Sequence, residues 1–293
     1  IGGGRGWDGR CFGVKVRVHN HYSFKSAERS NSQMTPDTLA ENRPRILSRP
    51  DGSSIAYHQS PGDGVGVVFL HGLKSDMNGG KALHVEQWCH QRNRPFLRFD
   101  QLGHGQSSGQ FIDGTIGRWA EDTVAVLDSL CDGPQVLIGS SMGGWVMLLA
   151  ALARPEKVVG LLGIAPAPDF TDDLTRSQIS PEQWEALQRD GICYFNSDYS
   201  CDPYPLTKAL FDDGHANSLL HSPIPYHGPV RILHGQQDDS VPWERSLTLA
   251  RQLVSDDVLC TFIKRGDHRL SEPEDLERMT RTLDELLARV GPT

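Results

Sequence analysis

The sequence has no long apolar run of the kind that crosses a membrane, and its first residues show no pattern typical of a secretory signal. None of its hydrophobic stretches approaches the roughly 20 residues that a helix needs to cross a bilayer. Its first residues do not follow the basic, apolar and small-residue order of a secretory signal. We therefore expect no membrane span and a cytoplasmic location, with mitochondria as the alternative if the source is eukaryotic.

An excess of positive charge is also missing. The chain has 29 lysines and arginines against 37 aspartates and glutamates, which gives a formal net charge of -8. No basic stripe concentrates the positive residues, and a net negative charge repels a phosphate backbone. The composition therefore predicts that nucleic acid is not a partner.

Metal and cofactor motifs are scarce as well. The six cysteines are scattered, without a C-x-x-C pair or a Cys/His cluster at zinc spacing, so reduced thiols are the simplest interpretation. The Gly-rich stretch at 100–107 contains neither a Walker lysine nor a G-x-G-x-x-G unit. We expect no metal and no cofactor, and nothing in the sequence indicates an oligomeric state.

The chain divides into an irregular N-terminal segment and a longer part in which strand and helix signals alternate. Residues 1–33 are Gly-rich and basic and end just before Met34, so we expect a disordered or non-native extension, followed by one domain at 34–293. Alternating strands and helices predict an α/β fold, with a mostly parallel sheet of about eight strands flanked by helices. The expected strands are 45–48, 55–58, 65–70, 95–99, 135–138, 158–164, 230–233 and 258–263, and the expected helices are 77–92, 116–131, 142–153, 243–254 and 273–290.

One interval, at about 170–225, breaks this alternation. It shows no clear strand pattern, yet aromatic residues are distributed through it among Asp, Ser and Pro. Disordered segments are usually poor in aromatics, and a loop of this length inside a compact domain is normally functional or separately structured. We therefore predict a small helical cap, with a partly disordered surface loop as the alternative.

Two adjacent serines lie between glycines after an apolar run. Residues 139–143, GSSMG, fit the G-x-S-x-G pattern between an expected strand and an expected helix. In such a nucleophile elbow the positions two before and two after the serine must be small, because the tight turn presses them against backbone. Framing on Ser141 places Gly139 and Gly143 there, whereas framing on Ser140 places bulky side chains there. We expect Ser141 to be the nucleophile; an ordinary Gly-rich turn with a capping serine is the alternative.

A serine hydroxyl needs partners before it can attack a carbonyl near neutral pH. A histidine must accept its proton, and a carboxylate must orient that histidine. After a nucleophile elbow, the acid and then the histidine follow along the chain, each behind a late strand. Asp238 and Asp239 follow the expected strand 230–233, and His268 follows 258–263. The order predicts His268 as the general base and leaves the two aspartates as competing orienting residues.

The negative charge that develops on an acyl oxygen also requires hydrogen-bond donors. Backbone N–H groups supply them in enzymes of this kind, one from the residue after the nucleophile and one from an early strand's loop. The first is Met142, and we expect the second to be Leu73, in the loop after strand 65–70. His71, in the same loop, is expected to be a buried, hydrogen-bonded turn residue.

These features together resemble the α/β-hydrolase superfamily, over about residues 48–290. The superfamily frame His-Gly-x-x-Asp-x-x-Val-Pro selects Asp238 over Asp239, and the resemblance implies a triad of Ser141, Asp238 and His268. Short stretches look like the branch that contains a mitochondrial palmitoyl-protein thioesterase, which also cleaves mycophenolic acid acyl-glucuronide. They are 77–83, 98–100, 139–145, 153–158, 220–225 and 267–269.

The sequence predicts a serine carboxylic-ester hydrolase that forms an acyl-enzyme on small or medium acyl esters. Basic residues are few in the expected cap, which favours neutral esters over acidic leaving groups. A thioesterase that acts on acyl-protein or acyl-CoA is the alternative within the same chemistry. A non-catalytic binding protein of the same fold is the alternative of another class, and the presence of all three triad positions disfavours it.

Overall fold

The computed structural model describes residues 43–197 and 200–291. All the described helices and strands belong to one compact unit, Pro44–Thr293. The extension predicted at 1–33 lies outside the described residues. Within the described part of the chain, no helix is long and apolar enough to cross a membrane.

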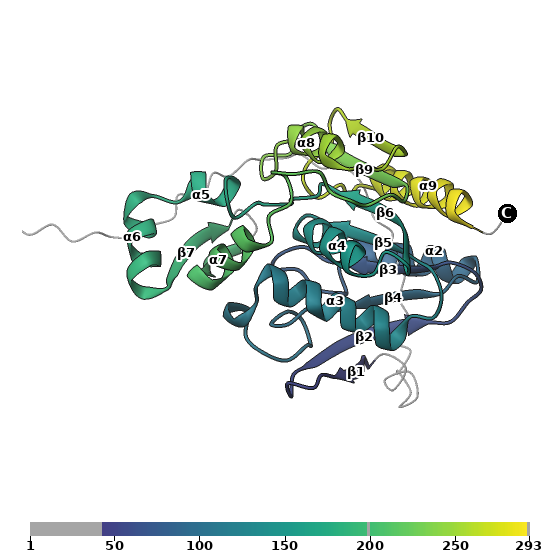
Figure 1. Cartoon of the computed structure of the whole chain (residues 1–293), viewed down its shortest axis with the longest axis horizontal. Helices are drawn as coiled ribbons and strands as arrows, with labels where there is room; N and C mark the ends of the chain where they lie inside the picture. The colour runs from purple at the N-terminus through teal and green to yellow at the C-terminus, as the bar shows by residue number, and fades with distance from the viewer. Residues whose placement is uncertain (1–42, 198–199, 292–293) are drawn as a thin grey trace, which may run out of the picture. The chain divides into compact units, whose positions relative to one another are not determined.

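An eight-stranded sheet forms the centre of this unit (Figure 1), with strand order β1-β2-β4-β3-β5-β6-β9-β10. The hairpin strands β1 and β2 run antiparallel to their neighbours, and all other neighbouring strands are parallel. The predicted α/β class with a mostly parallel sheet is therefore confirmed. The strands are β1 Arg45–Ser48, β2 Ser54–Ser60, β3 Gly66–Leu70, β4 Phe96–Phe99, β5 Gln135–Ser140, β6 Val158–Ile164, β9 Val230–Gly235 and β10 Val258–Ile263.

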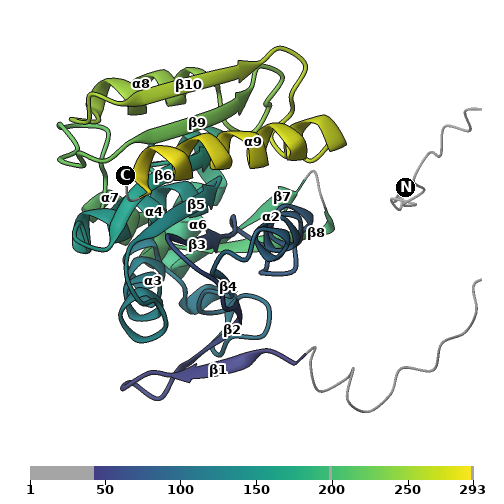
Figure 2. The same ribbon diagram turned by 90° about the vertical axis from the view of Figure 1, so that its right-hand side faces the viewer.

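Helices cover both faces of the sheet, as Figure 2 shows with α3 and α4 on one side and α2 and α9 on the other. The last helix illustrates why: its buried residues include Met279, Leu283 and Leu286, at helical spacing, and its remaining positions are mostly charged. Each large apolar side chain buried in this way stabilises the fold by about 1.5–3 kcal/mol. The bounds are α2 Gly80–Gln91, the 3₁₀ turn η1 Phe111–Asp113, α3 Ile116–Leu130, α4 Met142–Ala153, α8 Glu244–Gln252 and α9 Pro273–Val290.

The central parallel strands bring the predicted site residues to one edge. Strands β3, β5 and β9 are buried at every position, which fits their near-continuous apolar sequences. The loops that follow β3, β5, β9 and β10 carry Leu73, Ser141, Asp238 and His268 respectively. Because the carboxyl ends of parallel strands meet at the same edge, residues far apart in sequence become neighbours there.

The insertion between β6 and β9 contains three helices and a separate antiparallel hairpin. The helices agree with the predicted cap, but the hairpin is a feature that the sequence did not lead us to expect. Its second strand contains Pro203 and Pro205, and proline cannot donate to a ladder, so the segment lacks an ordinary strand pattern. The bounds are α5 Leu174–Gln178, α6 Pro181–Asp190, β7 Ile192–Ser197, β8 Ser200–Thr207 and α7 Lys208–Ala216.

Polar contacts of Asp169 and Arg245 hold both ends of this insertion. Asp169, which has a φ of 58°, accepts hydrogen bonds from the amides of Leu219 and Leu220 at 2.7–3.0 Å. At the same end, the guanidinium of Arg245 in α8 donates to the carboxylate of Asp173, which caps α5. The first and last residues of the insertion are thus tied together and to the core.

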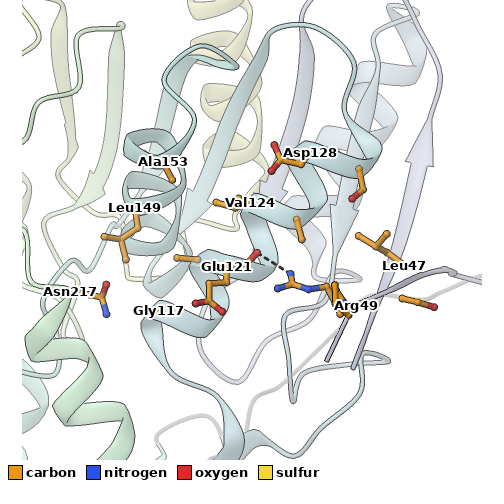
Figure 3. A pocket seen from close by; sticks show the side chains of 14 residues that line it. Leu47, Arg49, Gly117, Glu121, Val124, Asp128, Leu149, Ala153 and Asn217 are labelled. Carbon is orange, nitrogen blue, oxygen red and sulfur yellow. Dashed lines mark hydrogen bonds between the residues drawn. The ribbon is translucent and has the colours of Figure 1, made fainter. Parts of the chain in front are cut away.

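A surface pocket of about 720 Å³ lies between the end of β1 and the helices α3 and α4 (Figure 3). Arg49 at its rim donates to the carbonyl oxygen of Glu121 at 2.9 Å and lies 3.3 Å from the buried carboxylate of Asp122. These contacts tie the N-terminal hairpin to α3. None of the predicted triad residues lines this pocket, so it is separate from the site described next.

Candidate active site

Ser141 occupies a strained turn between β5 and α4. Its φ of 55° and ψ of -120° are unusual for a residue with a side chain, and they expose the hydroxyl at the start of the helix. A Cβ added at Gly139 would lie 2.4 Å from the carbonyl oxygen of Gly143, and one added at Gly143 would lie 2.4 Å from that of Leu70. Only glycine fits at either position. This steric requirement is the one by which the sequence favoured Ser141 over Ser140 as the nucleophile.

Three of the predicted side chains form one chain of hydrogen bonds. His268 Nε2 lies 3.1 Å from Ser141 Oγ, and His268 Nδ1 lies 2.7 Å from Asp238 Oδ2. The side chain of Asp238 is fully buried, whereas 16% of the His268 side chain remains exposed. With its hydrogen on Nδ1, the imidazole donates to the carboxylate and accepts from the serine hydroxyl. This arrangement can move a proton from Ser141 to His268.

The carboxylate of Asp238 is fully hydrogen-bonded. Its Oδ1 accepts from the amides of Ser240 and Val241 at 2.9 and 2.7 Å, and its Oδ2 accepts from His268 and His234. Although burial acts to raise the pKa of Asp238, the hydrogen bonds from His234 and His268 hold it well below its usual range. The group is therefore an anion beside the imidazole.

Asp239, the competing residue, does not contribute to this arrangement. It is exposed, and its Oδ1 accepts from the hydroxyl of Ser240 at 3.3 Å. The structure places Asp238 against His268, in the position that the superfamily frame indicated. Asp267, next to the histidine, accepts from the amide of Leu270 at 2.9 Å and acts as a turn residue.

The loop after β3 lies directly against the elbow. A Cβ added at Gly72 would lie 3.2 Å from both the carbonyl oxygen of Ser140 and the Cβ of Ser141. Within the described residues, the amides of Leu73 and Met142 donate to no protein acceptor. Met142 begins α4, so its N–H also points out of the positive end of the helix. Both amides are free to bind a developing anion.

His71 fixes the start of this loop. It is 2% exposed; its Nδ1 donates to the Gly72 carbonyl oxygen at 2.9 Å, and its Nε2 accepts from the Gln101 amide at 3.3 Å. Burial lowers the pKa of His71, which keeps the acceptor nitrogen unprotonated. The expectation of a buried turn residue agrees with these contacts.

His104 holds the other end of the same loop. Its Nδ1 donates to the Leu102 carbonyl oxygen at 3.1 Å, and its Nε2 accepts from the amide of Lys74 at 3.3 Å. Lys74 has a φ of 59°, so this hydrogen bond supports a strained residue directly after Leu73. Burial, followed by the nearby His71, lowers the pKa of His104 to about 3.

Replacing His104 by glutamine is expected to flatten the acid dependence of stability. Unfolded His104 binds a proton below about pH 6.5, whereas folded His104 remains neutral until about pH 3. The unfolded state therefore binds more protons in that window, and the free energy of unfolding falls as the pH falls, by about 1.4 kcal/mol per pH unit from this residue. Denaturant titrations from pH 7 to 4 should show a smaller slope for His104→Gln than for wild type. The same slope in both proteins would contradict the assignment; exposed His90→Gln is the control.

The loop that carries His268 is held by a lysine from α2, which lies on the same side of the sheet as α9, the helix that follows this loop. Lys81 in α2 donates from Nζ to the carbonyl oxygen of Arg269 at 2.5 Å. Burial lowers the pKa of Lys81 to about 8, and the nearby Asp267 acts in the other direction. This contact fixes the backbone next to the imidazole.

Sequence reasoning did not assign a role to Lys81 or to His234. Lys81 lies in one of the stretches that carried the family resemblance, but its spacing to His268 gives no signal. His234 is the first residue of the superfamily frame His-Gly-x-x-Asp-x-x-Val-Pro, near the end of β9 and four residues before Asp238, and that position is the clue in the sequence. Among the described residues, no group of three or more His, Cys, Asp or Glu side chains could hold a metal ion.

Known proteins share this arrangement of strands and loops. A family model described as serine aminopeptidase, S33, matches residues 65–188. The palmitoyl-protein thioesterase ABHD10, mitochondrial, of Pongo abelii is 40% identical over 248 residues, which are 84% of this chain and 80% of the relative. The solved structure of mouse α/β hydrolase domain-containing protein 10 has a TM-score of 0.78 at 40% identity and covers 84% of this chain and 98% of its own. The chain belongs to the ABHD10 family of α/β hydrolases.

Membership of the ABHD10 family confirms the predicted fold class and the predicted hydrolase activity. A solved structure from Agrobacterium vitis S4, with a TM-score of 0.79 at 38% identity, covers 83% of this chain and 96% of its own, so the likeness is not limited to mammalian relatives. The names of the ABHD10 relatives describe thioesterases and place those proteins in mitochondria. The expected cytoplasmic location finds no support among them.

Proposed function

We propose that this ABHD10-family protein hydrolyses acyl thioesters through a covalent acyl-enzyme on Ser141. The observation that carries the proposal is the hydrogen-bonded series from Ser141 Oγ through His268 to the buried carboxylate of Asp238. A serine with these partners is an acyl-transfer nucleophile. Relatives named as palmitoyl-protein thioesterases favour a long-chain acyl thioester over the small neutral ester that the sequence favoured.

The first half of the reaction forms the acyl-enzyme. Ser141 Oγ attacks the acyl carbonyl carbon as His268 Nε2 takes its proton, and the carbonyl oxygen becomes an anion bound by the amides of Leu73 and Met142. The buried Asp238 stabilises the imidazolium that forms. When the tetrahedral intermediate collapses, the carbon–sulfur bond breaks, and His268 returns the proton to the departing thiolate.

The second half releases the acid. Water attacks the ester of Ser141 while His268 accepts one of its protons, and the same two amides bind the new oxyanion. The bond to Ser141 Oγ then breaks, and His268 protonates the serine oxygen. One water is consumed, and one carboxylic acid and one thiol are released, so no cofactor or metal enters the balance.

A matched pair of substrates tests the preference for thioesters. Two peptides of one sequence would carry palmitate on a cysteine or on a serine, and a short p-nitrophenyl ester would be the third substrate. A thiolate is a better leaving group than an alkoxide, and we expect kcat/KM for the palmitoyl thioester to exceed that for the oxyester by about tenfold or more. A preference for the short ester over the palmitoyl thioester would contradict the proposal on substrate class. Failure on all three substrates would contradict the proposed function itself.

We further propose that the protein is located in mitochondria, as the names of its relatives state for those proteins. Fractionation of cells that express the full chain should place it with mitochondrial markers. Recovery with cytosolic markers alone would contradict this location.

A further inference from the structure

A second histidine, His234, contacts the same carboxylate as His268. His234 lies in β9, and its side chain is fully buried. Its Nε2 lies 3.1 Å from Asp238 Oδ2 and 3.0 Å from the carbonyl oxygen of Val241. An ionised carboxylate and a carbonyl can only accept, so His234 Nε2 carries the hydrogen and donates it to both.

The other ring nitrogen of His234 completes the assignment. Nδ1 lies 2.6 Å from the hydroxyl oxygen of Ser246 in α8, and Ser246 is 0% exposed. A hydroxyl can donate to an unprotonated Nδ1, so a neutral ring with its hydrogen on Nε2 satisfies every polar atom. A neutral ring also avoids an additional buried cation. The tautomer is therefore fixed by Ser246 on one side and by Asp238 on the other.

Two histidines thus share one oxygen of Asp238. Oδ2 receives the His268 Nδ1–H at 2.7 Å and the His234 Nε2–H at 3.1 Å, while two backbone amides occupy Oδ1. With all these donors in place, the carboxylate cannot rotate without losing hydrogen bonds in a dry environment. The second donor also withdraws charge from the oxygen that faces His268.

We propose that His234 is a positioning residue for the acyl-transfer reaction, an inference that rests on the proposed function of Ser141, Asp238 and His268. Its Nε2–H holds the Asp238 carboxylate in the orientation that meets His268, and it moderates the attraction of Oδ2 for protonated His268. The hydrogen-bonded series therefore begins at Ser246 and runs through His234 to the reacting serine.

Four charged side chains around this series have partners of their own. They occur in the loops after β9 and β10 and in α2 and α8, and none of these contacts involves either imidazole. They are Asp239 with Ser240, Asp267 with Leu270, Lys81 with Arg269, and Arg245 with Asp173. Because none of these contacts involves His234, they are not expected to account for a difference between the variants below.

Three substitutions separate the functions of the two ring nitrogens. Glutamine places an N–H near the position of Nε2, asparagine places one near Nδ1, and leucine keeps bulk without a polar atom. We expect His234→Gln to keep kcat within about threefold of wild type, and His234→Asn and His234→Leu to lose about tenfold or more in kcat with little change in KM. In His234→Asn and His234→Leu, the acid limb of the kcat/KM pH profile should move to higher pH. Without the hydrogen bond from position 234, Asp238 Oδ2 stabilises protonated His268 more strongly.

The tautomer can be measured without any variant. In nitrogen NMR spectra of wild-type protein carrying ¹⁵N-histidine, His234 should show a neutral ring protonated at Nε2. A ring protonated at Nδ1 alone would overturn the inference, as would an unchanged kcat and pH profile in His234→Leu or equal losses in the Gln and Leu variants. If His234→Leu fails to fold, the Gln–Asn comparison and the spectrum still decide.

Labelling of wild-type Ser141 by a fluorophosphonate tests the proposed function separately. If the wild-type protein is labelled and active while the His234 variants keep wild-type kcat, this inference alone is contradicted.

Discussion

Replacement of Ser141 by alanine is expected to lower kcat by about 10⁵-fold or more, to a rate near that left by the oxyanion donors and binding alone. The substitution removes the one hydroxyl that accepts the acyl group, and the proton path through His268 then has no origin. KM should change little, because the Ser141 side chain contributes little to ground-state binding. Steady-state hydrolysis of the palmitoyl thioester at several concentrations measures both quantities.

Ser140→Ala is the matched control for this experiment. Ser140 ends β5 and is buried, with no place in the proton path, so we expect its alanine variant to keep activity within about tenfold of wild type. If Ser140→Ala were inactive and Ser141→Ala active, the assignment of Ser141 as the nucleophile would be wrong. Melting temperatures of both variants separate loss of chemistry from loss of fold.

Replacement of Asp238 by asparagine is expected to lower kcat by about 10³- to 10⁴-fold at neutral pH. The amide keeps the shape of the carboxylate but removes the negative charge that stabilises protonated His268. Its NH₂ group, if turned to His268, also forces the hydrogen onto the wrong ring nitrogen. The pH profile of kcat, measured from pH 6 to 10, should show that part of the activity returns as the pH rises, because hydroxide substitutes for the missing base.

Asp239→Asn is the control for Asp238→Asn because it makes the same chemical change on the neighbouring residue. Asp239 is exposed and bonds only to its neighbour's hydroxyl among the contacts described, so its variant should retain wild-type kcat within about twofold. A reversal, with Asp239→Asn inactive and Asp238→Asn active, would contradict the placement of the buried carboxylate.

Much of the fold could be predicted because the sequence signals were local and redundant. The run of β-branched and apolar residues at Gly66–Leu70 is typical of a strand buried on both faces. The helical periodicity at Pro273–Val290 is typical of an amphipathic helix. The β7–β8 hairpin could not be predicted in the same way. Prolines at 203 and 205 argue against a strand, yet this segment pairs with β7, with Pro205 opposite Tyr194.

The candidate site shows the same division between local and long-range signals. The two serines could be distinguished because a glycine requirement is a steric property of the elbow itself, and the contacts at Gly139 and Gly143 agree with that requirement. The contact between His234 and Asp238 was missed, because a histidine at a strand end has the same sequence signature whether or not it meets a carboxylate. The superfamily frame at 234–242 contains His234 but selects only the aspartate, and the contact between the two side chains depends on the path of the loop at 236–241.

The most direct test of the account is to trap the acyl-enzyme and identify the residue that carries it. Wild-type protein would be mixed with palmitoyl thioester, quenched in acid within milliseconds to seconds, digested and analysed by mass spectrometry. We predict an added palmitoyl group on Ser141, present in Ser140→Ala and absent from Ser141→Ala. A palmitoyl group on any other residue, or turnover with a fluorophosphonate bound to Ser141, would contradict the central claim.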